Sequence, residues 1–413
     1  MQARRTTAAA PGAGQEMAYK YRHLPAVYLP YPGLHACRAD FNPAALAACQ
    51  RAWPGTQLQL MLAMPPAAAR ADAATYHGAL LREIGAHGAR WNGRACLQQW
   101  DFGAAPQALD ERQLAQLVEG LRRHFTVASD TAGAFSVTLA AAASERRVRQ
   151  LRCLGFNQLS IRLGARSGVG RAAALLAGAR AAGFRTLQLS LPPVAGAGNA
   201  FLLARRLQDA VRLQPDRIAV PGQQLHPLHG RILADGGYVQ AGADLFVPEL
   251  GTLRLSRLLA GQQRHPQGDR RFGGPNLLGI GAGAITAIGA SLSQHSGDAA
   301  DYCRRLAAEA SPVARAMVLS RDQLLRRTVM QMLLCEFELS TTLLETLFGI
   351  DFARYFAPEL ATLAAMQRDG LLLWEDGWLS LQRAGWPLAR RICSVFARRG
   401  ELVQRLQERG AHV

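Results

Sequence analysis

Lysine, closely spaced cysteines and long apolar runs are all scarce in this sequence. Lys20 is the only lysine among 413 residues, so arginine supplies nearly all of the positive charge behind the net charge of +17. No apolar run reaches the roughly 20 residues that a bilayer-spanning helix needs. The N-terminal stretch 1–17 has no apolar segment of the kind that a secretory signal contains. These absences predict a cytoplasmic protein without membrane insertion, and a disordered tail at residues 1–17.

The cysteines are too far apart in the sequence for a local metal or cluster site. None of them forms a CxxC or CxxxC pair, the spacing that zinc and iron–sulfur sites use. The seven cysteines are Cys37, Cys49, Cys96, Cys153, Cys303, Cys335 and Cys393. Without a secretory signal, disulfides are not expected either. The sequence therefore predicts no metal site, and most of these thiols are expected to be buried as small apolar side chains.

The positive charge has two explanations. A basic patch for nucleic acid is one of them. The other is composition, because arginine, alanine, glycine and leucine are abundant throughout and the arginines are spread along the chain. We favour composition, and keep nucleic-acid binding as an alternative.

Short apolar segments alternate with helical segments between residues 57 and 220. Strands are expected at 57–64, 96–102, 134–140, 157–163, 186–191 and 216–220. Helices, with apolar residues three and four apart, are expected at 74–87, 110–125, 144–154, 170–183 and 199–213. Such repeated units predict parallel strands in a partial or complete α/β barrel, with an open doubly wound sheet as the alternative. The segment 236–247 is expected to add one more strand unit.

The chain turns helical from Ser320. Ser320 and Gln323 have the spacing of a capping box, and Cys335 and Phe337 in the same segment are expected to be core residues. Asp376-Gly377 is typical of a hairpin turn, and a last helix is expected near Trp386. Helices followed by a hairpin predict a winged-helix-like domain.

Two further patterns have alternative interpretations. GIGAGAITAIG (279–289) contains dinucleotide-like glycines, but lacks the acidic residue at a strand end that such a site needs. Close backbone packing, or a backbone surface against a flat ligand, fits it better. His226 and His229 lie three apart and could ligate a metal or haem, although surface histidines share this spacing.

Several blocks, in order along the chain, are similar to one known family. They are YKYRHLPAVYLPYP, NLLGIGAGAITAIG, LRRTVMQMLLCEFEL and RDGLLLWEDGWLSLQRAGWPLARRIC. From about Tyr19 to Arg399 the chain resembles the oxygen-independent coproporphyrinogen III dehydrogenases, radical SAM enzymes of haem biosynthesis. The resemblance implies a radical-SAM-type partial (β/α) barrel with a C-terminal helical, winged-helix-like domain. The expected bounds are a tail at 1–17, an N-terminal arm at 18–56, the barrel at 57–300 and the C-terminal domain at 316–413.

The resemblance breaks down where the family holds its cofactors. After the first barrel strand, family members carry CxxxCxxC for a [4Fe–4S] cluster, whereas here PAAARADAAT is shorter and has no cysteine. The SAM-binding positions of the family correspond to Gly103, Ala104, Ala105, Pro106, Thr138, Gly164 and Ser190. Thr138 and Ser190 replace acidic residues. The resemblance therefore implies a degenerate member that has lost both the cluster and S-adenosylmethionine, and with them the means to form a radical.

These departures favour a non-catalytic homologue, a tetrapyrrole-binding or regulatory protein of haem and porphyrin metabolism. A residual coproporphyrinogen III dehydrogenase-type enzyme is the first alternative, and a nucleic-acid-binding regulator acting through the C-terminal domain is the second. No catalytic residue, metal or cofactor is predicted beyond a haem or porphyrin ligand, and the sequence names no protein partner. The expected ligand-binding residues are Tyr28, Tyr31, Gly279, Gly281, Gly283, Ile285, His226 and His229.

Overall fold

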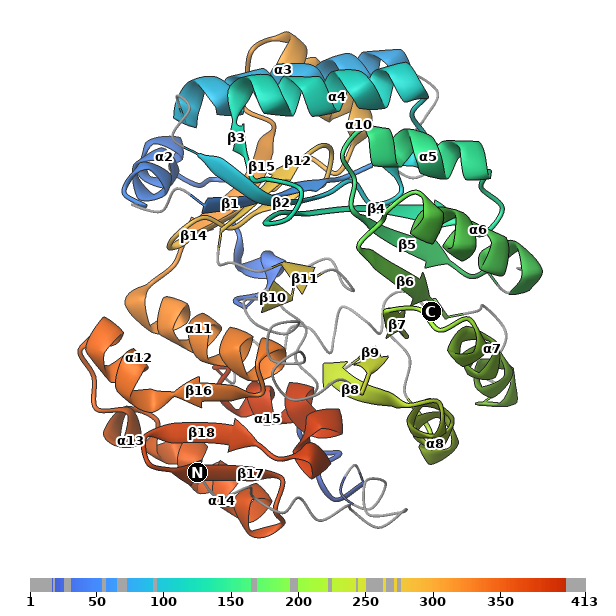
Figure 1. The fold of residues 1–413 in the computed structure, drawn as a ribbon. Helices are drawn as coiled ribbons and strands as arrows, with labels where there is room; N and C mark the ends of the chain where they lie inside the picture. Colours follow the sequence, from blue (N-terminus) through green and yellow to red (C-terminus); the bar gives the residue numbers. More distant parts are fainter. Residues whose placement is uncertain are drawn as a thin grey trace.

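The protein consists of an α/β sheet with helices along its outer side and a smaller C-terminal domain facing the other side (Figure 1). The computed structural model describes residues 17, 19–25, 31–53, 57–64, 73–91, 95–164, 169–193, 200–221, 225–242, 244–249, 263–264, 271–272 and 276–398.

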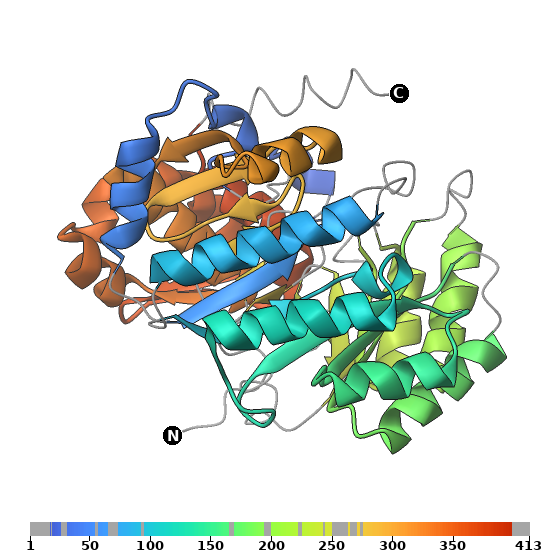
Figure 2. The same ribbon diagram turned by 90° about the horizontal axis from the view of Figure 1, so that it is seen from above.

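Six strands of the sheet run parallel and follow one another in chain order. They are β1 Gln57–Leu62, β2 Cys96–Asp101, β4 Ala134–Ala140, β5 Gln158–Arg162, β6 Thr186–Ser190 and β7 Arg217–Ala219. The connecting helices are α3 Ala73–Trp91, α4 Glu111–His124, α5 Glu145–Cys153, α6 Val169–Ala181 and α7 Ala200–Arg212. These helices cover one face of the sheet only (Figures 1 and 2). The predicted strands and helices are confirmed, and the fold is the partial barrel rather than the doubly wound sheet.

The sheet has two free edges within the part that the structure describes. One edge is β12 Leu277–Ile280, which lies parallel to β1. At the other edge β8 Tyr238–Gly242 and β9 Leu245–Pro248 form an antiparallel pair, and β9 is also antiparallel to β7. The strand unit expected at 236–247 is therefore present as two antiparallel strands. Its two strands lie too close in the chain for a crossover helix, so only a hairpin can join them.

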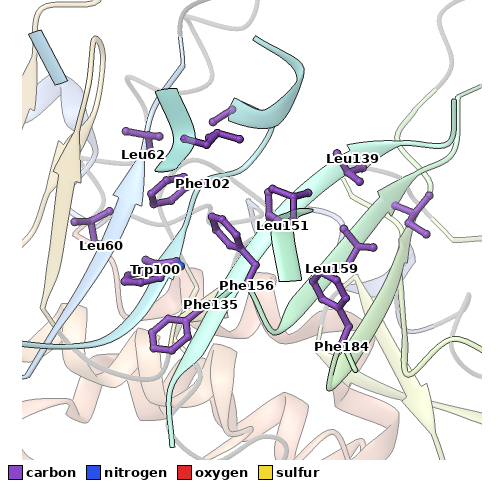
Figure 3. Packing of buried hydrophobic residues seen from close by; sticks show 14 of the residues in the cluster. Leu60, Leu62, Trp100, Phe102, Phe135, Leu139, Leu151, Phe156, Leu159 and Phe184 are labelled. Carbon is purple, nitrogen blue, oxygen red and sulfur yellow. The ribbon is translucent and has the colours of Figure 1, made fainter. Parts of the chain in front are cut away.

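Apolar side chains fill the layer between the sheet and its helices (Figure 3). Alternate residues of each strand point toward the helices, because successive side chains of a strand face opposite ways. Trp100 of β2 and Phe135 of β4 have ring centroids 4.3 Å apart. Phe102 meets Phe156 edge to face at 5.1 Å. The remaining, alternate side chains of each strand therefore face the opposite, concave side of the sheet.

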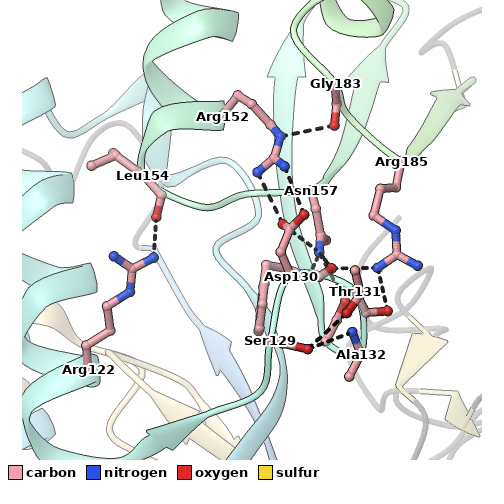
Figure 4. A network of polar contacts seen from close by, with 12 residues as sticks. Arg122, Ser129, Asp130, Thr131, Ala132, Arg152, Leu154, Asn157, Gly183 and Arg185 are labelled. Carbon is pink, nitrogen blue, oxygen red and sulfur yellow. Dashed lines mark hydrogen bonds and ion pairs between the residues drawn. The ribbon is translucent and has the colours of Figure 1, made fainter.

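A polar network joins the loops at the amino-terminal edge of the sheet (Figure 4). Arg152 binds both carboxylate oxygens of Asp130, at 3.2 and 2.9 Å, and donates to the carbonyl of Gly183. Asn157 and Arg185 donate to the backbone carbonyl of Asp130 at 2.9 and 2.6 Å. In α/β barrels this edge stabilises the fold, whereas site chemistry lies at the carboxyl ends of the strands. A depression of about 710 Å³ beside this network therefore lies at the stabilising edge.

After β12 the chain leaves the main sheet. Three antiparallel strands, β13 Ile285–Thr286, β14 Ser291–His295 and β15 Val313–Val318, form a separate sheet. Helix α10 Ala299–Ala307 follows β14 and packs against α3. Near the N-terminus, α2 Pro43–Arg51 packs against β15.

The C-terminal domain has its own apolar core. Its elements are α11 Arg321–Cys335, β16 Glu338–Ser340, α12 Thr341–Phe348, α13 Phe352–Tyr355, α14 Ala357–Arg368, β17 Leu372–Glu375, β18 Trp378–Leu381 and α15 Ala389–Val395. The Ser320–Gln323 capping box is confirmed. Asp376 and Gly377 form the hairpin turn with φ of 52° and 75°, as predicted. The last helix, α15, begins three residues after Trp386.

The expected core of this domain is confirmed where the structure describes it. Phe337 is 3% exposed, and its ring stacks on Trp386 at 4.5 Å. The side chain of Cys335 lies outside the described part of the chain.

The N-terminal segment packs on the C-terminal domain. Tyr21 is buried in that core, and its hydroxyl donates to Asp369 at 2.5 Å. Arg391 donates to three backbone carbonyls, those of Tyr21, Arg22 and Leu24. The segment around Tyr21 and the C-terminal domain thus share one core.

Candidate functional site

The concave face of the sheet carries rows of polar side chains. Strand β4 shows the pattern clearly, because its residues alternate between buried and partly exposed along its whole length. The strand register aligns one such row across four strands. Its members are Thr138 on β4, Ser160 on β5, Gln188 on β6 and Arg217 on β7. Gln188 Nε2 donates to Ser160 Oγ at 3.3 Å within this row.

A cavity of about 110 Å³ lies on this polar face. Its lining residues come from the end of β2, the middle of β4, from β5 to β7, and from β9. They are Asp101, Ser136, Val137, Thr138, Gln158, Leu159, Ser160, Arg162, Thr186, Gln188, Ser190, Arg217 and Leu245. The cavity thus extends over the concave face from the first residues of β5, β6 and β7 to the last residues of β5 and β6. The cavity is therefore the candidate functional site.

The structure brings two of the predicted cofactor positions together. Thr138 and Ser190 both line the cavity. The segment Gly103–Pro106 lies beside them, since the backbone N–H of Thr138 donates to the carbonyl of Gly103 at 2.7 Å. Ala105 and Pro106 are buried in the short 3₁₀ turn there, next to Ala104. Gly164 lies two residues beyond the end of β5 and does not line the cavity.

Sequence reasoning missed the charged residues of this cavity. The sequence places Arg217 and Asp101 in strands without a role for either, although Asp101 continues the polar alternation that Gln99 begins in β2. Asp101 is 7% exposed and accepts a hydrogen bond from the backbone N–H of Gly103 at 2.6 Å. Burial lowers the pKa of the Arg217 guanidinium, against the opposing effect of Asp216. Alternation was the available signal, but the register between strands was needed to place these residues on one surface.

The glycine-rich block is tightly packed backbone. A Cβ added at Gly279 would lie 2.3 Å from the carbonyl oxygen of Ile285. One added at Gly281 would lie 2.3 Å from the carbonyl oxygen of Ala63. Gly283 has space around it but a φ of +72°. Close packing thus accounts for Gly279 and Gly281 without a ligand, and the proposed ligand contacts of Gly279, Gly281, Gly283 and Ile285 stay predictions.

Helix capping accounts for the two histidines. His226 Nδ1 accepts from the backbone N–H of Leu228 at the start of α8 Pro227–Asp235. His229 Nδ1 accepts from the backbone N–H of His226 at 3.1 Å, so its Nε2 carries the proton and donates to Ala200 O at 2.8 Å. Both ring nitrogens of His229 are therefore engaged, which leaves no lone pair for a metal or haem iron.

The two predicted tyrosines are not at the cavity in the described part of the chain. Tyr31 is 4% exposed in the core of the C-terminal domain, where its hydroxyl accepts from the backbone N–H of Arg398. Tyr28 lies outside the described residues.

A second cluster of titratable groups lies buried beside the glycine block. Glu83 of α3 is 1% exposed, and its Oε2 accepts from the backbone N–H of Gly281 at 2.9 Å and from the hydroxyl of Tyr302. His295 Nδ1 lies 3.2 Å from Glu83 Oε1 and 3.1 Å from the carbonyl oxygen of Gly281, so it carries a proton. The cluster ties α3, α10 and β14 to the turn after β12.

The C-terminal hairpin has the wrong charge for nucleic acid. Three carboxylates, those of Glu338, Glu375 and Asp376, line a pocket of about 200 Å³ beside Trp378. Arginine and lysine neutralise the phosphates in nucleic-acid binding, whereas carboxylates repel them. This face therefore gives no support to nucleic-acid binding through the hairpin.

Metal donors are dispersed in the described part of the chain. No group of three or more histidine, cysteine, aspartate or glutamate side chains there could hold a metal ion. Of the described cysteines, Cys96 starts β2 and Cys153 ends α5, at the edge of the sheet opposite the cavity. None of the helices in the described ranges is long and apolar enough to cross a membrane.

Comparison with known proteins agrees with this architecture. Residues 319–388 match the model of the HemN C-terminal domain. The chain is 29% identical to the oxygen-independent coproporphyrinogen III oxidase of Pseudomonas aeruginosa over 80% of each chain. It is 27% identical to the Escherichia coli protein of the same name, covering 91% of this chain and 93% of the other. Over most of its length the chain is similar to the oxygen-independent coproporphyrinogen III oxidases.

A solved structure matches the fold of this chain over almost the full length of both proteins. It is the structure described as coproporphyrinogen III oxidase (HemN) from Escherichia coli, a radical SAM enzyme. The TM-score is 0.79 at 22% identity, over 92% of this chain and 98% of that one. The resemblance drawn from the sequence and the radical-SAM-type fold are thus confirmed.

Proposed function

We propose that this relative of the coproporphyrinogen III oxidases has lost radical SAM chemistry and binds a tetrapyrrole in haem metabolism. One observation carries the proposal. The family's acidic positions fall on Thr138 and Ser190, and both line a cavity whose only described carboxylate, Asp101, is already hydrogen-bonded. A site for S-adenosylmethionine would need acceptors for its ammonium group and ribose, and neutral hydroxyls replace carboxylates there.

The donor chemistry after β1 does not fit a [4Fe–4S] cluster. Thiolates hold such clusters, and the sequence from Ala63 to Ala73 contains no cysteine. Its only ionisable side chains are Arg70 and Asp72. No reaction step is therefore assigned to a cluster in this protein.

Tetrapyrrole binding is supported by the relatives and by the charge of the concave face. The relatives are named for coproporphyrinogen III, a substrate that carries carboxylates. Arg162 and Arg217 lie on the polar face, and guanidinium groups bind carboxylates in strong, directional pairs. The enclosed volume of about 110 Å³ suits a side arm, so the macrocycle would lie outside it.

Coproporphyrin III should bind saturably, with a Kd in the micromolar range. Quenching of tryptophan fluorescence during a titration measures this. Arg162→Gln should weaken binding, because it removes a partner for a propionate. The matched control Arg205→Gln changes an exposed arginine on the helix-covered side and should leave the affinity unchanged. No saturation up to about 100 μM, equivalent to about −5.5 kcal/mol, would exclude the tetrapyrrole part of the proposal.

A residual enzyme is the competing function. It requires a cluster that reduces S-adenosylmethionine, so the two functions differ in a product that can be measured directly, 5′-deoxyadenosine.

A further inference from the structure

Arg217, at the start of β7, is partly buried, and its guanidinium has no hydrogen-bond or ion-pair partner among the described residues. Its Nε is buried and has no hydrogen-bond partner among the described residues. The neighbouring Asp216 does not supply one, because its Oδ2 accepts from the backbone N–H of Leu187 at 2.7 Å. Burying an unpaired polar group is unfavourable, so such a group in a native fold requires an explanation.

A nearby arginine shows what a structural guanidinium looks like in this fold. Arg206 of α7 is 9% exposed. Its Nε also lacks a partner, but its terminal nitrogens donate to the carbonyls of Pro192 at 2.9 Å and Leu163 at 2.6 Å. It thereby joins the chain just beyond β5 to the chain just beyond β6. Arg217 makes no such contact within the described ranges and instead lines the cavity.

The charges around the cavity favour an anion. Arg162 and Arg217 are its described basic residues and Asp101 its described acid. Asp101 already accepts from the backbone N–H of Gly103. The remaining polar lining consists of serine, threonine and glutamine side chains, which donate hydrogen bonds without adding charge. A cation placed here would meet two guanidinium groups.

We propose that the cavity on the concave face is a binding site for a carboxylate group, with Arg217 as its anchor. Ser160, Gln188 and Thr138, which share a row with Arg217, donate to or orient the bound group. The inference goes beyond the proposed function, because it holds whichever larger ligand carries the carboxylate.

Donor type favours a carboxylate over a phosphate, and the cavity is large enough for a short carboxylate arm. A volume of about 110 Å³ equals the liquid volume of about four water molecules, which suits a short carboxylate arm. Phosphate sites typically use backbone N–H groups at a helix N-terminus. The donors here are side chains in the middle of strands, whose backbone N–H groups are engaged in the sheet.

Propionate is the probe that tests this site in the full-length protein. Saturation-transfer NMR should show saturable binding of propionate, and none of propionamide, which has the same shape without the charge. Arg217→Gln should weaken propionate binding at least tenfold, whereas the exposed control Arg205→Gln should leave it unchanged. Sodium chloride balances ionic strength throughout.

The ligand-free proteins give a second, independent readout. Since the guanidinium of Arg217 holds no other part of the described chain in place, Arg217→Gln should leave the melting temperature unchanged or raise it, as expected where a binding group opposes stability. A lower melting temperature combined with unchanged propionate binding would show that Arg217 is structural and overturn the inference. Displacement of propionate by lower concentrations of inorganic phosphate would overturn the carboxylate assignment. Loss of porphyrin binding alone would bear on the proposed function and not on this site.

Discussion

Gly281→Ala should destabilise the protein by more than about 3 kcal/mol, because it combines overpacking, at about 1–3 kcal/mol, with backbone strain of similar size. Gly281 has φ of +105°, and an added Cβ would lie 2.3 Å from the carbonyl oxygen of Ala63 and 2.8 Å from the hydroxyl of Tyr76. These two atoms are hydrogen-bonded to each other at 2.9 Å. The methyl group would therefore separate β1 from the turn after β12.

Gly283→Ala is the matched control. Its φ of +72° is also positive, but an added Cβ would meet only Gly297 Cα, at 3.8 Å. The expected loss is about 1–2 kcal/mol, from the left-handed conformation alone. Denaturant unfolding of the two variants measures the difference. Equal losses would mean that the close approach at Gly281 does not exist.

Glu83→Ala should cost about 2–6 kcal/mol, because it leaves two buried donors, the backbone N–H of Gly281 and the hydroxyl of Tyr302, without an acceptor, at about 1–3 kcal/mol each. Glu83→Gln retains a carbonyl acceptor and should cost less. A loss within ±0.5 kcal/mol for Glu83→Ala would show that the buried cluster does not support the fold.

The same cluster should make stability fall in acid. Burial alone would raise the pKa of Glu83, but His295, His87 and Tyr302 together hold it below its usual range. Burial lowers the pKa of His295, and this outweighs the opposing effect of Glu83. Tyr76 and Tyr302 also face the cluster, and burial raises the pKa of both. Neither tyrosine therefore titrates at the pH values considered, and the two shifts that bear on stability there are those of Glu83 and His295.

The lowered pKa values of Glu83 and His295 both make the folded protein less stable as the pH falls. A carboxylate with a lowered pKa stabilises the fold above its unfolded value of about 4.3, and this contribution is lost as pH falls through the folded value. A histidine with a lowered pKa binds its proton more readily in the unfolded chain, so its contribution is complete above about 6.5 and declines below it. Stability should therefore fall from about pH 6.5 downward, and Glu83→Gln should flatten the part below about pH 4.3. Equal pH profiles of the two proteins in chemical denaturation would contradict this.

Much of the fold followed from local patterns. The alternation in strands such as Ala134–Ala140 and the capping box at Ser320 are features of neighbouring residues, so the sequence contains them directly. The hairpin at 238–248 was missed because its first strand resembles the parallel ones before it, and only the short link distinguishes them.

The site was harder to predict because its residues meet through the strand register. Thr138 and Arg217 lie 79 positions apart in the sequence, and share a row only because Ser160 pairs with Thr138 and Gln188 pairs with both Ser160 and Arg217. The histidines at 226 and 229 show the opposite problem. A spacing of three suits a metal pair and a helix cap equally, and only the contact of His229 with Ala200 distinguishes them.

Formation of 5′-deoxyadenosine tests the central claim most directly. The protein is reconstituted anaerobically with iron and sulfide, then incubated with dithionite, S-adenosylmethionine and coproporphyrinogen III, with the Escherichia coli enzyme treated in parallel. The loss of radical SAM chemistry predicts less than one cluster per chain and no 5′-deoxyadenosine above the protein-free control. A stable four-iron cluster together with repeated turnover of S-adenosylmethionine would contradict it and establish the chain as an active enzyme.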